Sequence, residues 1–229
     1  MCFFDFGFMT NSPPPPSNAE LARLVRALDE AGTAIALVDA VRDLAAAENP
    51  EAIPYLMDAL KFNNPGAAVA AVEGLVTLGT VAVEPIMAQI DGYNYGARAW
   101  ATRALSEIGD PRALDLMLAV ADGDFAPSVR RSAVKGLGCL RWQELSAAVR
   151  RDRQQQVVPI MVKACTDVEW VVRYGAIAGI QAFLSNPTTH DRDLRNQLFD
   201  SLKHVSKEDS DFAIRLRSRY ALESLSMVP

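Results

Sequence analysis

The sequence has few of the residues that build metal centres or disulfide frameworks. It holds three cysteines and two histidines among 229 residues, and neither type has the spacing of a metal-binding motif. We therefore expect no metal site. An odd cysteine count without a secretion signal is typical of reduced thiols, so we expect a cytoplasmic protein. Cys139 and Cys165 lie on predicted helix faces rich in Ala and Val, where we expect buried thiols.

An excess of basic charge is also lacking. The formal net charge is −5 at pH 7, whereas a nucleic-acid-binding surface needs Lys and Arg to neutralise phosphates. Nucleic acid is therefore not an expected partner. No Ser-His-Asp set, phosphate-binding loop or metal-ligand set is recognisable, so hydrolase, kinase and metalloenzyme functions lack support.

Long apolar runs are the third absence. The first apolar residues form a short run that contains Asp5 and lacks a basic flank, unlike a signal peptide. We expect no membrane span, because no later stretch approaches the length that a bilayer requires. Residues 1–17 include four consecutive prolines, so we expect a disordered, Pro-rich N-terminal tail, with Met1 and Met9 both possible start residues. Strand-like alternation is missing throughout.

What the sequence does contain is a helical repeat. Half of its residues are hydrophobic. A small residue followed four positions later by Leu or Ile recurs at intervals of roughly 30 residues, and about a dozen more in the last two intervals, as in helical solenoids. These pairs are Ala40/Leu44, Ala71/Leu75, Ala101/Leu105, Ala133/Leu137, Ala176/Ile180 and Ala221/Leu225. The period predicts one all-α domain over residues 18–229, a right-handed α-solenoid of about six helical pairs.

Capping residues and helix breakers give the expected helix positions. We expect helices near residues 19–30, 33–47, 51–61, 65–78, 95–108, 111–121, 127–140, 156–166, 169–184, 191–204 and 211–226, a short helix that ends at 91–92, and an extra helical segment within 141–155. The first helices, over residues 21–41, are strongly apolar for a terminal repeat. We therefore expect that end of the array to pack on a partner.

An Asp stands before the second helix of three pairs, and an Arg follows within that helix. The three pairs of residues are Asp91/Arg98, Asp124/Arg130 and Asp167/Arg173. This pattern resembles HEAT repeats, and the resemblance implies a ladder of Asp/Arg contacts along the turns and one concave face. A structural role in the ladder is therefore the stronger alternative for each of these arginines.

One turn holds more aromatic and polar side chains than a helical repeat needs. In the stretch DGYNYGARAW (91–100), Tyr93 and Tyr95 lie in a short connection, and Trp100 lies at the border of the apolar stripe. Such a set suits a flat, conjugated, partly charged ligand or a protein hot spot. A locally packed aromatic turn is an equally good alternative.

Three segments (63–79, 91–118 and 124–138) closely resemble the E/F-type phycobilin lyases. These HEAT-like proteins of phycobilisome-containing organisms attach open-chain tetrapyrroles to cysteines of phycobiliproteins. The likeness covers residues 30–225, and YNYGARAWA is its most specific part. In length, the chain resembles the smaller of the two lyase subunits.

The resemblance implies a subunit of a heterodimeric lyase that attaches phycocyanobilin by a thioether bond. The bilin is then a substrate, with no permanently bound cofactor. An E-type lyase subunit is the implied partner and the phycocyanin α subunit the implied client, in the cyanobacterial cytosol or the plastid stroma. A carboxylate could keep the pyrrole nitrogens protonated, and arginines could pair with the propionates. The implied catalytic residues are Asp91 and Arg98, and the implied bilin contacts are Tyr93, Asn94, Tyr95, Trp100 and Arg130.

Some relatives in this family also isomerise the bilin and contain an Asn-His-Cys-Gln-Gly-Asn motif. The motif is absent here, so we expect attachment without isomerisation. The alternative from another class is a non-catalytic HEAT adaptor that binds phycobiliproteins or bilins, for example in phycobilisome turnover.

Overall fold

The computed structural model describes residues 18–90 and 94–227. The expected disordered tail, Asp91 and Tyr93 lie outside these residues. Within them the chain is helical and contains no strand. Its elements are α1 (Asn18–Asp29), α2 (Ala34–Ala46), η1 (Pro50–Ala52), α3 (Ile53–Ala59), α4 (Pro65–Leu78), η2 (Gly79–Ala82), α5 (Val83–Gln89), α6 (Tyr95–Ile108), η3 (Pro111–Ala113), α7 (Leu114–Gly123), α8 (Pro127–Cys139), η4 (Trp142–Glu144), α9 (Ala147–Ala164), α10 (Trp170–Ser185), α11 (Arg192–Glu208) and α12 (Phe212–Ser226).

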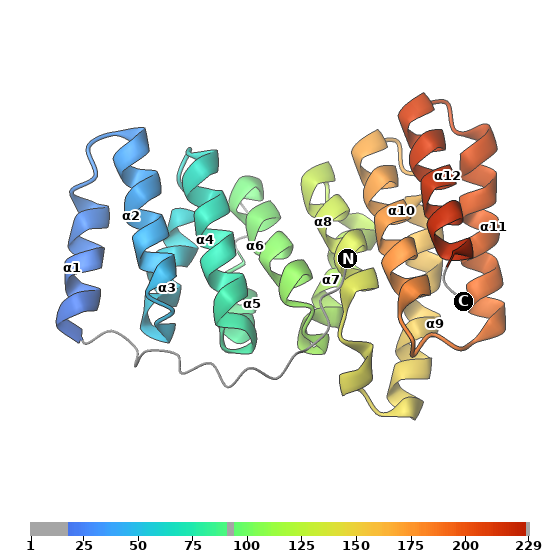
Figure 1. Ribbon diagram of the computed structural model, residues 1–229, viewed down its shortest axis with the longest axis horizontal. Helices are drawn as coiled ribbons and strands as arrows, with labels where there is room; N and C mark the ends of the chain where they lie inside the picture. The colour runs from blue at the N-terminus through green and yellow to red at the C-terminus, as the bar shows by residue number, and fades with distance from the viewer. Residues whose placement is uncertain (1–17, 91–93, 228–229) are drawn as a thin grey trace.

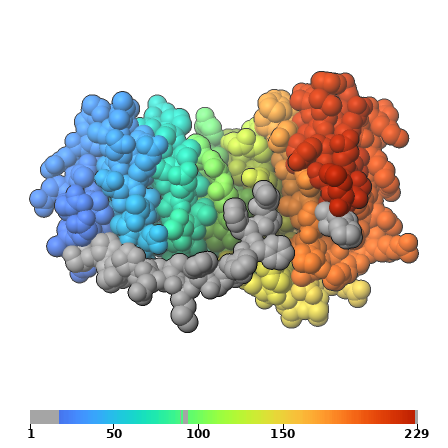
Figure 2. Space-filling view, viewed as in Figure 1, coloured from blue at the N-terminus to red at the C-terminus, as the bar shows by residue number. Residues whose placement is uncertain are grey.

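Consecutive α-helices form six pairs, which stack side by side in one row (Figure 1). The even-numbered helices form one layer and the odd-numbered helices the other. Each even-numbered helix packs directly on its even-numbered neighbours, whereas the odd-numbered helices touch one another less. Closer packing of one layer curves the row, so the even-numbered layer is the inner one. The expected all-α, HEAT-like solenoid of about six pairs is confirmed. Figure 2 shows the same row of repeats as a continuous packed surface.

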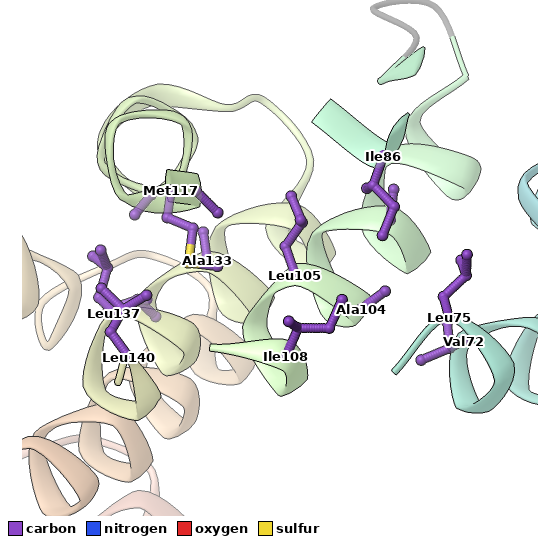
Figure 3. Close-up of a cluster of buried hydrophobic side chains, with 14 of the residues drawn as sticks. Val72, Leu75, Ile86, Ala104, Leu105, Ile108, Met117, Ala133, Leu137 and Leu140 are labelled. Carbon is purple, nitrogen blue, oxygen red and sulfur yellow. The ribbon is translucent and has the colours of Figure 1, made fainter. Parts of the chain in front are cut away.

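The apolar stripe of each even-numbered helix builds one continuous core. Leu105 and Ile108 of α6 lie between Leu75 of α4 on one side and Leu137 of α8 on the other (Figure 3). Met117 of α7 closes this part of the core from the odd-numbered layer and is fully buried. The core therefore runs from repeat to repeat, as the spacing of small and aliphatic residues predicts.

Glycine sets the distance between α8 and α10. A Cβ on Gly138 would overlap the carbonyl oxygen of Gly179, and a Cβ on Gly179 would overlap the carbonyl oxygen of Val134. The two backbones are therefore in direct contact. The α8–α10 contact is the most extensive between two helices in the described part of the solenoid.

Two sequence expectations about the middle of the chain are wrong. The separate helix expected near 156–166 is the second half of α9, which runs unbroken through Pro159. Val157, Val158 and Met161 are buried on one face of α9, and this packing holds the helix together across the proline. Cys139 is exposed, because it lies on the side of α8 that points away from the core. Cys165 is buried, as expected.

The N-terminal repeat has its own polar surface. Leu21, Leu24 and Leu28 of α1 are buried inside the chain. The opposite side of α1 carries Arg23, which is ion-paired with Glu20, and the exposed Arg26. The leucines of α1 are therefore used within the chain, whereas Ile35 of the same segment is exposed, and packing of this end on a partner stays a prediction.

One stretch, Pro65–Ala88, is long and apolar enough to cross a membrane, contrary to the sequence expectation. Half of the apolar window is buried inside the solenoid. The stretch is also not one straight helix, because Gly79 has a positive φ of 67° between α4 and η2. A buried core helix passes the same test of length and composition.

Candidate functional site

An arginine–aspartate ladder runs along the turns that lead from odd- to even-numbered helices. In each rung, the Nε and Nη2 atoms of one arginine donate to both carboxylate oxygens of the aspartate in the next turn. The rungs are Arg98–Asp124 (2.8 and 3.1 Å), Arg130–Asp167 (2.8 and 2.9 Å) and Arg173–Asp209 (2.7 and 3.0 Å). The ladder implied by the HEAT resemblance is confirmed.

Each ladder aspartate also closes its own turn. Asp124 accepts a hydrogen bond from the backbone N–H of Ala126 at 2.8 Å, and the other two ladder aspartates make the same contact two residues on. The arginines bind these turns as well: the Nη1 atom of Arg130 donates to the backbone carbonyl of Asp124 at 2.7 Å. The rungs therefore fix the starts of α8, α10 and α12.

Two of the ladder rungs lower the pKa of their aspartate. Burial alone would raise the pKa of Asp167, but the hydrogen bond from Arg130 and the nearby guanidinium charges lower this pKa below its usual value. The pKa of Asp209 is lowered in the same way, by Arg173 against the effect of burial. The arginines of these rungs are matched by negative charge and add little net charge to the surface.

The turn before α6 brings three of the predicted site residues together. Asn94 caps the helix, since its Oδ1 accepts from the backbone N–H of Ala97 at 3.0 Å. Tyr95 is the first residue of α6 and is 59% exposed. Arg98 lies one turn further along and is buried in its ion pair with Asp124. Asp91 and Tyr93, which the sequence pattern grouped with these residues, lie outside the described residues.

The sequence prediction missed Phe125, which belongs to this site. Its ring contacts Tyr95 edge-on, with 6.4 Å between the ring centroids, and the guanidinium carbon of Arg98 lies 5.1 Å from its centroid. Phe125 is 69% exposed. The repeat period contains the signal, because Phe125 directly follows the aspartate that pairs with Arg98.

Of the other two described site residues, Arg130 touches this cluster, because its Nη1 atom donates to the backbone carbonyl of Phe125 at 3.3 Å, whereas Trp100 makes separate contacts. Trp100 is half-buried against the core, and Arg103 lies 5.6 Å from the centroid of its ring. Arg130 belongs to the next rung of the ladder, where it is bound to Asp167. The structure therefore gives Arg98 and Arg130 ladder contacts, and their roles toward a ligand stay predictions.

Comparison with known proteins identifies the family. The family described as PBS lyase HEAT-like repeat matches residues 21–62 and 97–123. A Synechocystis protein named phycocyanin alpha phycocyanobilin lyase CpcF is 46% identical over 209 residues, which cover 91% of this chain and 96% of the relative. The chain belongs to the CpcF family of phycocyanobilin lyase subunits.

Other relatives agree with this CpcF-family assignment. A Thermosynechococcus vestitus protein named phycocyanobilin lyase subunit beta is 42% identical and covers 91% of this chain and 99% of the relative. A chain in the solved complex of CpcE and CpcF of phycocyanin lyase from Nostoc sp. PCC7120 is 41% identical, with a TM-score of 0.70. That match covers 76% of this chain and 99% of the Nostoc chain.

Proposed function

We propose that this chain is one subunit of a heterodimeric lyase that attaches phycocyanobilin to a cysteine of the phycocyanin α subunit during phycobilisome assembly. The observation that carries the proposal is the near full-length likeness to the Synechocystis protein of that name. An E-type lyase subunit is the proposed partner, and the solved Nostoc complex of CpcE and CpcF supports this choice. A cytosolic or stromal location follows from the proposal.

In the proposed reaction, the cysteine sulfur of the client adds to the ethylidene group on ring A of the bilin. A C–S bond forms, the tetrapyrrole takes up the thiol proton, and no group leaves. The bilin is therefore a substrate. The lyase has to hold it extended, keep its pyrrole nitrogens protonated and bring the thiol to one face.

We assign these tasks to the turn between α5 and α6. Asp91 is the proposed acidic group beside the pyrrole nitrogens, and Tyr93 a proposed bilin contact. Tyr95 is exposed and lies against Phe125, so the two rings offer an aromatic surface to a flat tetrapyrrole.

Arg98 acts on this turn chiefly by position. Its bond to Asp124 fixes the start of α6, where Asn94 caps the helix, so it holds the aromatic rings in place. Trp100 is proposed to contact the bilin from the half-buried side of α6. Arg130 is bound to Asp167 and to the backbone carbonyl of Asp124, so it holds the next turn in place. Any contact between Arg130 and a bilin propionate is proposed to be made from this fixed position.

Co-expression tests the proposed function. The client, the bilin-forming enzymes and an E-type subunit are produced with and without this chain, and the denatured client is scored by zinc fluorescence. We expect covalent bilin on the phycocyanin α subunit only when both lyase subunits are present.

An adaptor would give a different result. A chain that binds the client or the bilin, yet leaves the rate and the product of attachment unchanged, would be a non-catalytic HEAT adaptor. An active site variant, Asp91→Ala, is the matched control, because it should retain partner binding while attachment falls.

A further inference from the structure

Every repeat of the solenoid exposes a large apolar side chain at the same edge. These side chains lie in, or directly after, the turns that lead from odd- to even-numbered helices, on the upper edge in Figure 1. We call this surface the apolar turn edge; it consists of Ile35, Phe62, Tyr95, Phe125, Val168, Trp170 and Phe212. Their exposed fractions run from 38% for Phe62 to 89% for Val168.

The opposite edge differs. The opposite edge has fewer such side chains among its described residues: Val81 in the turn before α5, Val149 near the start of α9 and Met227 directly after α12 are 52%, 47% and 76% exposed. Folding alone does not require this asymmetry, since both edges consist of short helix–helix turns. A row of exposed apolar side chains with a member in every repeat is typical of an interaction surface.

The aromatic rings of this edge are held in place. Arg98 lies over the ring of Phe125, and Arg215 lies 5.6 Å from the centroid of Phe212. The ring of Tyr95 rests edge-on against Phe125 across two repeats. Rings fixed before a partner arrives lose little conformational entropy on binding, which is how binding hot spots are built.

The area and the charge of the edge indicate the kind of occupant. Aromatic side chains bury about 150–250 Å² each. Several that are half exposed or more, together with Ile35 and Val168, therefore approach the ~800 Å² that each partner buries in a standard interface. Arg98, which lies against the ring of Phe125, is paired with Asp124. Arg130 of the next rung is paired with Asp167, so this part of the edge selects apolar surface rather than negative charge.

The position of Tyr95 decides between partners. It lies in the third of the six turns, so the turn proposed to hold the bilin is in the middle of the apolar turn edge. A protein substrate whose cysteine must enter that turn has to pass over the neighbouring turns. We infer that the apolar turn edge docks the client protein through an apolar face of the client.

The inference rests on the proposed function, and two variants on the same helices test it. Trp170→Ser/Phe212→Ser removes the edge at α10 and α12, well away from the proposed bilin turn. Tyr174→Ser/Tyr220→Ser is the matched control, because it removes exposed aromatic rings from the same two helices but not from the edge. Phe212 and Tyr220 are both 62% exposed, and Trp170 and Tyr174 are 52% and 43% exposed.

Both double variants are assayed as the heterodimer. For Trp170→Ser/Phe212→Ser we expect the KM for the client to rise about tenfold or more, as for the loss of two interface hot spots, with kcat at saturating client nearly unchanged. The control should retain the wild-type KM. A wild-type KM in the edge variant, or an equal rise in the control, overturns the inference.

A binding measurement without chemistry separates this inference from the proposed function. Client whose acceptor cysteine has been alkylated is titrated with the wild-type and variant heterodimers in the absence of bilin. Weaker binding of the edge variant alone supports the inference even if no attachment activity is found. If the edge variant instead fails to co-elute with the E-type subunit, loses only bilin affinity, or changes only self-association, the edge has another occupant and the inference is wrong.

Discussion

Arg98 shows how one side chain can satisfy both a structural and a functional pattern. In the sequence it stands in the most distinctive segment of the chain, and in the structure its side chain is only 5% exposed, in a bidentate pair with Asp124. Loss of one member of a buried pair leaves the other charge without compensation. We therefore expect Arg98→Ala to lower the free energy of unfolding by about 3 kcal/mol or more in urea denaturation.

Arg103→Ala is the matched control for this prediction. Arg103 is also ion-paired, with Glu107 at 2.7 Å, but both side chains are about one-third exposed. Exposed pairs contribute about 0.5 kcal/mol, so the control should be close to wild type. An equal loss of unfolding free energy in the two variants would show that the buried Arg98–Asp124 pair does not stabilise the fold more than an exposed pair.

A second variant separates the ladder role of Arg98 from a role in catalysis. Asp124→Asn breaks the same rung and leaves Arg98 in the protein. If Arg98 acts only by position, attachment should fall equally in Asp124→Asn and Arg98→Ala when compared at equal folded fractions. A much larger loss in Arg98→Ala would assign Arg98 a direct contact with the reactants.

The two described cysteines should differ in reactivity. Burial raises the pKa of Cys165 to about 11, so almost none of this thiol is ionised at pH 8. Cys139 is exposed at the end of α8. In a Cys2→Ser background we expect maleimide to label Cys139 in the native protein and Cys165 only in urea, as read by peptide mass spectrometry. Equal native labelling rates would contradict this.

The ladder should also make stability depend on pH. The pKa of Asp167 is lowered in the folded state, so its contribution is complete above the unfolded pKa of about 3.9 and is lost as the pH falls through the folded value. Wild type should therefore exceed Asp167→Asn in stability at pH 7, and the difference should shrink as the pH falls below the unfolded pKa of about 3.9. Urea denaturation above and below that pKa measures it; a constant difference would exclude ionisation as the cause.

At the level of the helices, the sequence predicted the ends of a helix correctly where the capping residues agreed with the spacing of the repeats. Pro65 and Gly79 bound α4 where the sequence predicted, and α6 begins at Tyr95 after its Asn94 cap. The failures had tertiary causes. α9 continues through Pro159 because its buried face packs on both neighbours, and a single-sequence rule for proline contains no information about that packing.

The contact between α8 and α10 gives the prediction at this scale. Gly138→Ala would put a methyl group onto the carbonyl oxygen of Gly179, so the two helices must move apart. We expect a loss of about 1–3 kcal/mol, as in overpacked cores, by thermal or urea unfolding. Gly123→Ala is the control, since a Cβ at Gly123 meets nothing within 4 Å. A Gly138→Ala protein as stable as the control would mean that the helices are not packed this closely.

At the scale of the whole molecule, the sequence predicted the solenoid and the ladder but only part of the site. Repeats impose the fold because each pair must bury its stripe on the next pair. Phe125 could not be assigned to the site from local sequence, since it meets Tyr95 only through stacking of neighbouring repeats. The apolar turn edge was missed for the same reason, because one or two exposed apolar residues in a turn become a pattern only when the turns are aligned in space.

The last prediction concerns the product of the assembled lyase. Moving a double bond of the bilin requires a group that removes a proton at one carbon and returns one at another, which an adjacent His and Cys could do. The residues before the three cysteines are Met1, Gly138 and Ala164, so the chain contains no His-Cys pair. We therefore expect the client to carry unchanged, red-absorbing phycocyanobilin, as read from its absorption spectrum in acidic urea. A blue-shifted phycoviolobilin band would show that another set of residues moves the proton and that the chain belongs with the isomerising lyases.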